Sequence, residues 1–175
     1  TKPYEVIPFQ YSIHIEAVNG QVDHEEFLGL SGEDPSRSLV LKLIDDLGDE
    51  GPVLAYSGYE QRIIEGLRKK HSDLAGPLTT IIERLVDMMP PIIEFVLHPE
   101  MKGSWSIKDV ALALLPALSY DSLGEISIGS AASDAFIEAI SPTIIAERKA
   151  QLRAGLLRYC ELDTECMYEL MGSLC

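Results

Sequence analysis

Apolar and polar side chains alternate near the start of the chain. Between residues 9 and 17 the apolar side chains occupy every second position, at Phe9, Tyr11, Ile13, Ile15 and Ala17. A period of two is typical of a half-buried strand. Asn19 and Gly20 tolerate the positive φ angles of a tight turn, so they predict a hairpin with a returning strand at about 25–30.

A helical period replaces this alternation after residue 34. Asp34-Pro35 is typical of a helix start, and Gly48 is typical of a helix end. The apolar positions between them keep one helical face. A short apolar strand is expected at 53–56, and a helix that carries Ile63, Ile64 and Leu67 should follow it.

The rest of the chain is predicted to be mainly helical. Helices are expected at 78–89, 91–97, 107–115 and 131–140, a weakly extended segment at 126–128, and a long amphipathic helix from 142 to 174 with a break near 162–163. Ser106 and Asp109 predict a capping box for the third of these helices. A hairpin followed by a crossover helix and a further strand predicts an α/β fold, with a mixed sheet flanked by helices. We expect residues 1–175 to form a single domain.

Composition is that of an ordinary soluble protein. Apolar residues make up 46% of the 175-residue chain and charged residues 24%. No apolar run reaches the roughly 18 residues of a membrane span. The three cysteines, Cys160, Cys166 and Cys175, form no CxxC pair. They therefore favour a reducing, cytoplasmic compartment over a disulfide framework.

A net charge of −14 is a weak argument against nucleic acid as a partner, because it repels a polyanion. Two features weaken that argument further. Basic residues cluster at 68–71 and between 148 and 158. Nucleases that hold divalent metals also concentrate carboxylates, which the metals neutralise.

Three motifs contain residues that could carry chemistry. Glu60 follows a buried strand and a small-residue turn, where a carboxylate projects from a sheet edge; stabilisation of the helix start is the simpler explanation for it. Tyr159 and Asp163 lie four residues apart, so they share one helix face. A metal-binding carboxylate beside a phenol suits phosphodiester hydrolysis, although for the pair by itself a half-buried tyrosine with an exposed acid is the simpler explanation.

The third motif lies at the start of the helix expected at 107–115. Backbone amides there, with Ser104, Ser106 and Lys108, could receive a phosphate of the substrate. Ordinary capping by Ser106 is the simpler reading. Asp87 is a further candidate acid, directly after an apolar pair, and a surface helix position explains it equally well.

Four segments, taken in chain order, resemble a known family: Pro8–His14, Leu54–Glu60, Gly103–Lys108 and Tyr159–Thr164. They resemble a bacterial family of uncharacterised proteins, the domain-of-unknown-function family numbered 2779, over nearly the whole chain. That family is similar in turn to the DnaQ-like 3′–5′ exonucleases of the ribonuclease H fold, which use four acids and two divalent metal ions. The resemblance implies a ribonuclease H-like fold and an action on single-stranded DNA or RNA with Mg²⁺ or Mn²⁺.

Site residues follow from the same resemblance. Glu60 matches the acid of the second motif, where the superfamily usually has aspartate, and Asp163 matches the metal ligand of the last motif. Tyr159 matches the tyrosine that positions the attacking water. The Asp-x-Glu pair of the first motif has no counterpart here; in the family it would precede Thr1, on a central strand.

These departures lead us to expect a piece of a longer protein, inactive in this truncated form. Without the first motif, metal affinity should be low, because hard cations need several oxygen ligands. The missing central strand would leave neighbouring strand edges unpaired, which another copy of the chain could cover as a homo-oligomer. The alternative is a non-catalytic nuclease-like fold that serves as a protein-interaction or regulatory module. An enzyme of unrelated chemistry ranks last, because neither a nucleophile elbow nor a phosphate-binding glycine loop is present.

Overall fold

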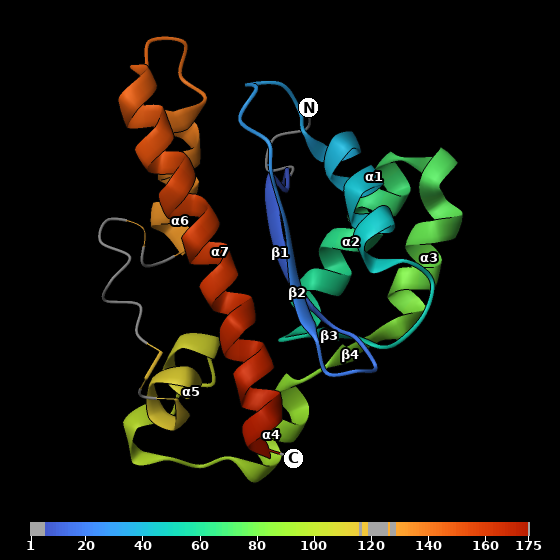
Figure 1. The fold of residues 1–175 in the computed structure, drawn as a ribbon, viewed down its shortest axis with the longest axis vertical. Helices are drawn as coiled ribbons and strands as arrows, with labels where there is room; N and C mark the ends of the chain where they lie inside the picture. The colour runs from blue at the N-terminus through green and yellow to red at the C-terminus, as the bar shows by residue number, and fades with distance from the viewer. Residues whose placement is uncertain (1–5, 116, 119–125, 127–128, 175) are drawn as a thin grey trace. The chain divides into compact units, whose positions relative to one another are not determined.

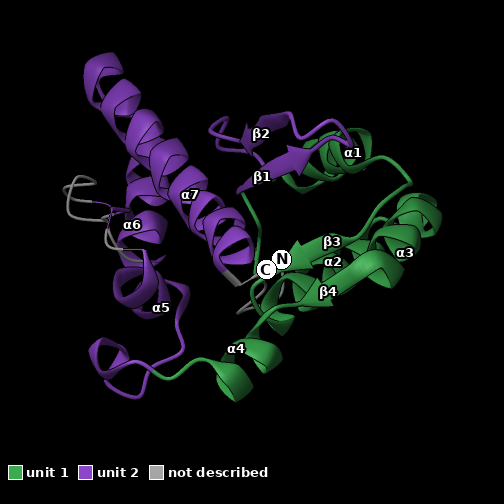
Figure 2. Cartoon of the chain, turned by 60° about the horizontal axis from the view of Figure 1, so that its bottom comes forward, with its two compact units in different colours: residues 1–9, 34–97 green, residues 10–33, 98–175 purple. Residues whose placement is uncertain are grey.

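The computed structural model describes residues 6–115, 117–118, 126 and 129–174. The chain divides into two compact units, which Figure 2 shows in separate colours. Unit 1 comprises residues 1–9 and 34–97, and unit 2 comprises residues 10–33 and 98–175. Both units contain strands as well as helices, so the predicted α/β class is confirmed. No helix among the described residues is long and apolar enough to span a membrane.

Unit 1 contains two parallel strands and the helices that connect and cover them. Its elements are α1 (Ser36–Leu47), β3 (Val53–Ala55), α2 (Gly58–Lys70), η1 (Ser72–Leu74), α3 (Ala75–Arg84), β4 (Leu85–Asp87) and α4 (Met89–Phe95). β3 and β4 pair in parallel, with Ala55 opposite Asp87 (Figures 1 and 2). Both strands therefore end at the same edge, which is where α/β proteins place their sites.

Local sequence signals account for the limits of α1. Asp34 Oδ1 accepts a hydrogen bond of 2.9 Å from the backbone N–H of Ser36. Gly48 has a φ of 52° and donates its N–H to the carbonyl of Ile44, so it ends the helix as predicted. The core of this unit includes apolar side chains from α1, α2, α3, β3 and the residue that follows β3: Leu39, Val40, Leu43, Ala55, Tyr56, Ile64, Leu67, Leu78 and Ile81.

The helix predicted at 78–89 is wrong in its second half. The helix α3 ends at Arg84, and the next three residues form β4 before α4 begins at Met89. Residues 85–87 pair with β3 instead of continuing the helix. The hydrogen bonds of this pairing satisfy the backbone N–H and C=O groups of the segment, and the apolar pattern of the sequence does not reveal the partner strand. Asp87 consequently ends a strand, and the surface helix position expected for it is wrong.

Unit 2 consists of an antiparallel hairpin and a set of helices that pack on the long C-terminal helix. Its elements are β1 (Gln10–Glu16), β2 (Val22–Leu28), η2 (Pro99–Met101), α5 (Ile107–Leu114), α6 (Gly129–Ala139) and α7 (Ala146–Leu174). The described strands of the chain thus form two separate two-stranded sheets rather than the single mixed sheet expected. The weakly extended segment expected at 126–128 lies outside the described residues except for Ile126.

The hairpin is where the alternation predicted it, with a different turn. β2 begins at Val22, three residues before the predicted start. Ala17 pairs with Gln21 across a three-residue loop, and Gly20 alone in that loop has a positive φ, of 80°. This is the geometry of a turn closed by a glycine bulge, so Asn19 does not need the left-handed conformation expected for it.

The long helix α7 runs without the predicted break. Its apolar stripe continues through the middle of the helix at Leu152, Leu156, Leu162, Cys166 and Leu170, all of them buried. That stripe packs on α6, on α5 and on the hairpin. Figure 1 shows α6 beside one half of α7 and α5 beside the other. This packing stabilises the helix through residues 162–163, where the break was predicted.

Candidate functional site

Glu60 lies in the first turn of α2, directly after the corner that leaves β3. Ser57 is the N-cap residue, and its hydroxyl accepts a hydrogen bond of 3.2 Å from the N–H of Tyr59. The Glu60 carboxylate in turn accepts backbone hydrogen bonds from Ser57 and from its own residue. Ser57 and Glu60 therefore form a reciprocal capping box, and the structural role considered from the sequence is present.

The second carboxylate oxygen of Glu60 takes no part in the capping box. Glu60 Oε2 is buried and has no hydrogen-bond partner among the described residues. Burial raises the pKa of this carboxyl, and the negative charge of Asp87 raises it further, while the hydrogen bonds at the cap lower it. A buried, unpartnered carboxylate oxygen is costly, and a cation beside it would remove that cost.

Asp87 supplies the second acid at this edge. It is the last residue of β4, opposite Ala55, and its Oδ1 accepts a 2.9 Å hydrogen bond from the N–H of Met89. Its other oxygen points to the corner before α2, because a Cβ placed on Gly58 would lie 4.0 Å from Asp87 Oδ2. The sequence signal for this residue is an acid directly after the apolar pair Leu85-Val86, which a surface helix position explains equally well.

The two carboxylates suit a hard divalent cation in their chemistry. Mg²⁺ is often bound through one or two carboxylates, with waters and substrate phosphates completing its octahedral shell. Among the described residues, no group of three or more histidine, cysteine, aspartate or glutamate side chains is arranged to hold a metal. Glu60 and Asp87 would therefore supply part of a ligand shell, of the kind that a substrate phosphate completes.

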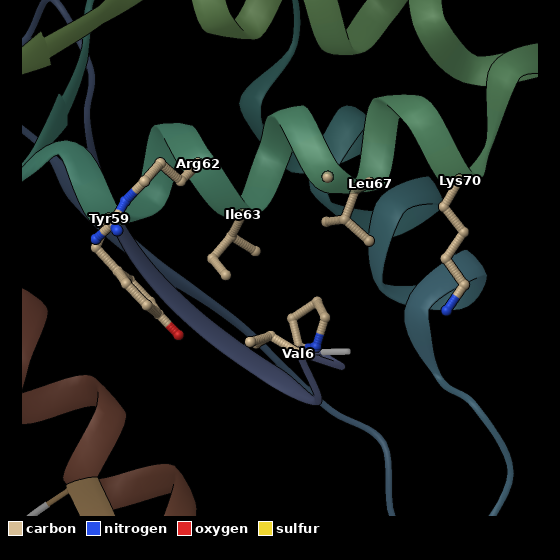
Figure 3. A pocket seen from close by; sticks show the side chains of 8 residues that line it. Val6, Tyr59, Arg62, Ile63, Leu67 and Lys70 are labelled. Carbon is tan, nitrogen blue, oxygen red and sulfur yellow. The ribbon is translucent and has the colours of Figure 1, made fainter. Parts of the chain in front are cut away.

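A groove runs along α2, the helix whose first turn carries Glu60. It has a volume of about 340 Å³ and is lined by Val6, Pro8, Tyr59, Arg62, Ile63, Gly66, Leu67 and Lys70. Figure 3 shows Ile63 and Leu67 directed from the helix toward Val6, with Tyr59 at one end and Lys70 at the other.

Its rim combines an aromatic ring with positive charge. The Tyr59 side chain is 51% exposed, and the Arg62 guanidinium lies 5.8 Å from the centre of its ring. Lys70 forms an ion pair with Asp34 at 2.5 Å. In the sequence only the basic run at 68–71 stands out. Tyr59, Arg62 and Lys70 line one groove because that face of α2 is open, and the sequence does not show which face is open.

The predicted tyrosine–aspartate pair lies on α7 in unit 2. Tyr159 donates its hydroxyl to the Asp163 carboxylate one turn along the helix. Burial raises the pKa of the Tyr159 phenol above its ordinary range, and the Asp163 charge adds to this. Tyr159 is thus a neutral hydrogen-bond donor at all physiological pH values.

Lys108 joins this pair from α5. Its ammonium lies 4.6 Å from the centre of the Tyr159 ring, in a cation–π geometry. Burial lowers the pKa of Lys108, and the negative charge of Asp163 opposes that shift. The Asp163 carboxylate is therefore held by a phenol and by an ammonium charge, both from its own unit.

The other two residues predicted to bind substrate are used at the start of α5. Ser106 is its N-cap and accepts the N–H of Asp109 at 3.3 Å, as the predicted capping box requires. The hydroxyls of Ser104 and Ser106 both donate to Asp109 Oδ2, which lowers the pKa of that carboxyl. The simpler reading of these serines, as capping groups, accounts for all of these contacts.

The candidate residues thus form two groups. Glu60, with Asp87 and the groove, lies in unit 1, and Tyr159, Asp163 and Lys108 lie in unit 2. The expected meeting of Glu60, Tyr159 and Asp163 at one metal site stays a prediction.

Comparison with known proteins bears on unit 1 most directly. No curated protein and no solved structure gives a significant match to the chain. A family model matches residues 1–106, a segment that includes Glu60, Asp87 and the groove and ends before Lys108, Tyr159 and Asp163. Because this match covers more than half of the sequence, the chain belongs to the family described as Domain of unknown function (DUF2779).

Proposed function

We propose that the chain has the function of a 3′–5′ exonuclease of the DnaQ-like, ribonuclease H fold, which hydrolyses nucleic-acid phosphodiesters with divalent metal ions. The observation that carries this proposal is the acidic pair at the carboxyl edge of β3 and β4. Glu60 has a buried oxygen that finds no hydrogen-bond partner in the described part of the chain, and the charge of Asp87 acts on this carboxyl. This arrangement is poor for stability alone, because the charge of Asp87 disfavours the charged form of Glu60.

A divalent cation would be held by Glu60 and Asp87, with the phosphate of the substrate as a further ligand. Bound there, the cation supplies Lewis-acid polarisation of the phosphodiester and a nucleophilic water. The groove beside α2 is suited to the nucleic-acid strand itself. Tyr59 offers an exposed aromatic face on which a base can stack, and Arg62 offers a guanidinium to a phosphate.

Tyr159, Asp163 and Lys108 form a second group, within unit 2, whose chemistry also suits a phosphodiester. Tyr159 donates a hydrogen bond to Asp163, so the pair can orient a water between phenol and carboxylate. Lys108 carries the positive charge that favours an approaching phosphate.

The test is hydrolysis of 5′-labelled single-stranded DNA and RNA by the full natural protein, with Mg²⁺ or Mn²⁺ and with chelator. We expect metal-dependent release of mononucleotides from the 3′ end. Glu60→Gln, Asp87→Asn and Asp163→Asn should each lower the rate by about 100-fold or more. Asp73→Asn, at an exposed acid paired with Arg37, is the matched control and should keep the wild-type rate.

A non-catalytic module is the second candidate. It is favoured by the Asp163 carboxylate, which already has Tyr159 and Lys108 as partners of its own, and by the net charge of −14. Absence of metal-dependent hydrolysis, or full activity in Glu60→Gln and Asp163→Asn, would decide for this module and against the nuclease.

A further inference from the structure

The face of the hairpin that packs on α7 is polar. His14 on β1 stands directly opposite His24 on β2, and Ser12 precedes them on the same face. Ser12 is only 6% exposed although it is a polar residue. Thr164 from α7 reaches this face and completes a network of four side chains. A histidine pair thus lies at the contact between the two elements.

Four hydrogen bonds hold the network together. The Thr164 hydroxyl donates to the backbone carbonyl of Glu161 at 3.0 Å. Its single proton is then used, so it accepts from Ser12 Oγ at 2.8 Å and from His14 Nδ1 at 3.0 Å. Because the Ser12 proton goes to Thr164, Ser12 accepts from His24 Nε2, also at 2.8 Å.

This order of donors assigns the protons of both rings. His14 carries its proton on Nδ1 and His24 on Nε2, so each ring is complete as a neutral imidazole. Adding a second proton to either ring breaks none of the four hydrogen bonds. The cost of acid is therefore electrostatic, since it puts positive charge into a half-buried contact.

The surroundings decide how large that cost is. The centres of the two imidazole rings are 4.9 Å apart, and Tyr168 of α7 stacks on His14 at 6.3 Å. Burial lowers the pKa of His14, and the charge of His24 lowers it further. The acids Glu161 and Glu165 on α7 oppose this shift, and Glu16 and Glu26 share the histidine face of the hairpin.

We propose that the His14–His24 pair is a pH-sensitive contact, which weakens the packing of the hairpin on α7 when the protein is acidified below neutral pH. The stabilisation is complete above the ordinary imidazole pKa of about 6.5. This stabilisation is lost as the pH falls through the lowered pKa of His14. The reason is that His14 binds the extra proton more readily when the hairpin is detached from α7 than when it is packed on it. The device is independent of any nuclease activity.

The first experiment follows the two imidazole rings by NMR between pH 8 and pH 5 in the full chain. His24→Gln places an amide donor near the position of Nε2, so it keeps the bond to Ser12 and removes the charge. We expect the pKa of His14 to rise in this variant. An unchanged pKa of His14 would show that the pair is not coupled and would overturn the proposal.

The second experiment measures the protection of backbone amides from hydrogen exchange at pH 7.5 and pH 5.5. At each pH the wild type is compared with variants. We expect protection of residues 10–28 and 159–168 in the wild type to fall on the order of tenfold at the lower pH. His14→Asn combined with His24→Gln preserves both donors and should remove most of that fall. Gln21→Ala, on the exposed turn of the same hairpin, is the control and should behave like the wild type.

Hydrogen exchange is read at residues 10–28 and 159–168 of unit 2. The result is therefore separate from the titration of Glu60 in unit 1. Equal loss of protection in the wild type and in the double variant would overturn the proposal. If the double variant does not fold, the single variants His14→Asn and His24→Gln and the titration of the imidazole rings still test the proposal. Each single variant removes one of the two charges and keeps one histidine.

Discussion

Glu60 combines two roles that have opposite effects on stability. One carboxylate oxygen serves the capping box of α2, and the other is buried near Asp87 with no hydrogen-bond partner among the residues that the structure describes. The first role stabilises the helix start by roughly 1 kcal/mol, as N-terminal caps do. The second costs free energy at neutral pH, because the folded state holds the ionised group less favourably than water does.

Replacement of Glu60 by glutamine should therefore stabilise the metal-free chain at neutral pH. Glutamine keeps an acceptor for the cap and removes the charge, for an expected gain of about 0.5–1 kcal/mol after solvent screening. Because the folded-state pKa of Glu60 is raised, the wild type recovers stability as the pH falls from that raised value to the ordinary glutamate range. Urea unfolding at pH 7.5 and at pH 4 measures this, and a gain that persists unchanged at pH 4 would contradict it.

Asp87 shows why a single residue can be missed from sequence. The Leu85-Val86-Asp87 segment fits the end of a helix as well as a strand, since three residues are too few to distinguish a period of two from one of 3.6. Its partner strand lies more than 30 residues earlier in the chain. Only that pairing puts the acid at the edge where Glu60 lies.

At the scale of elements, Arg84 ties two connections of unit 1 together. It ends α3, and its guanidinium donates to the carbonyls of Gly51 at 2.7 Å, Gly48 at 2.6 Å, Leu47 at 2.9 Å and Glu50. These carbonyls belong to the end of α1 and the turn that leads into β3. The Arg84 side chain therefore supplies hydrogen bonds to four backbone carbonyls that are left without partners in a helix or strand and would otherwise bind water.

Arg84→Ala should destabilise unit 1 by about 2–3 kcal/mol, because charged hydrogen bonds to several carbonyls are lost together. Thermal or urea unfolding measures the change. Arg37→Ala is the matched control, since Arg37 forms only an exposed ion pair with Asp73, and it should have little effect. Equal effects of the two substitutions would mean that the Arg84 contacts contribute nothing beyond a surface charge.

The long helix α7 connects the candidate residues of unit 2 with its pH-sensitive contact. Asp163 directly precedes Thr164, which bonds to the hairpin, and Tyr159 lies one helical turn before Asp163. The predicted break near 162–163 would have separated these residues from one another. Burial of Leu162 at 1% exposure shows that this part of the helix is instead a packing centre.

The whole molecule carries twice as many acids as bases, 28 against 14. Mutual repulsion of these charges lowers stability at low ionic strength. Raising NaCl from 0.02 M to 0.2 M should therefore stabilise the chain by roughly 1 kcal/mol, or about 2–4 °C in unfolding temperature. A fall in unfolding temperature would show that the surface ion pairs outweigh the net charge.

MgCl₂ at the same ionic strength distinguishes screening from binding. A cation held by Glu60 and Asp87 stabilises the folded state by mass action, so Mg²⁺ should raise the unfolding temperature beyond the effect of NaCl. The extra stabilisation should disappear when Glu60→Gln and Asp87→Asn are combined. An equal response of both proteins to Mg²⁺ would argue against a site at this edge, whatever the activity of the protein.

By itself the sequence determined the local structure of this protein: the hairpin at 10–28, the limits of α1, the strand and corner before Glu60, and the one-turn spacing of Tyr159 and Asp163. Each depends on neighbouring residues, through alternation, capping or helical periodicity. The tertiary structure alone decided the pairing of β4 with β3, the place of Asp87, the groove along α2 and the histidine contact with α7. These depend on backbone pairing and packing between segments far apart in the chain, and no pattern within one segment encodes them.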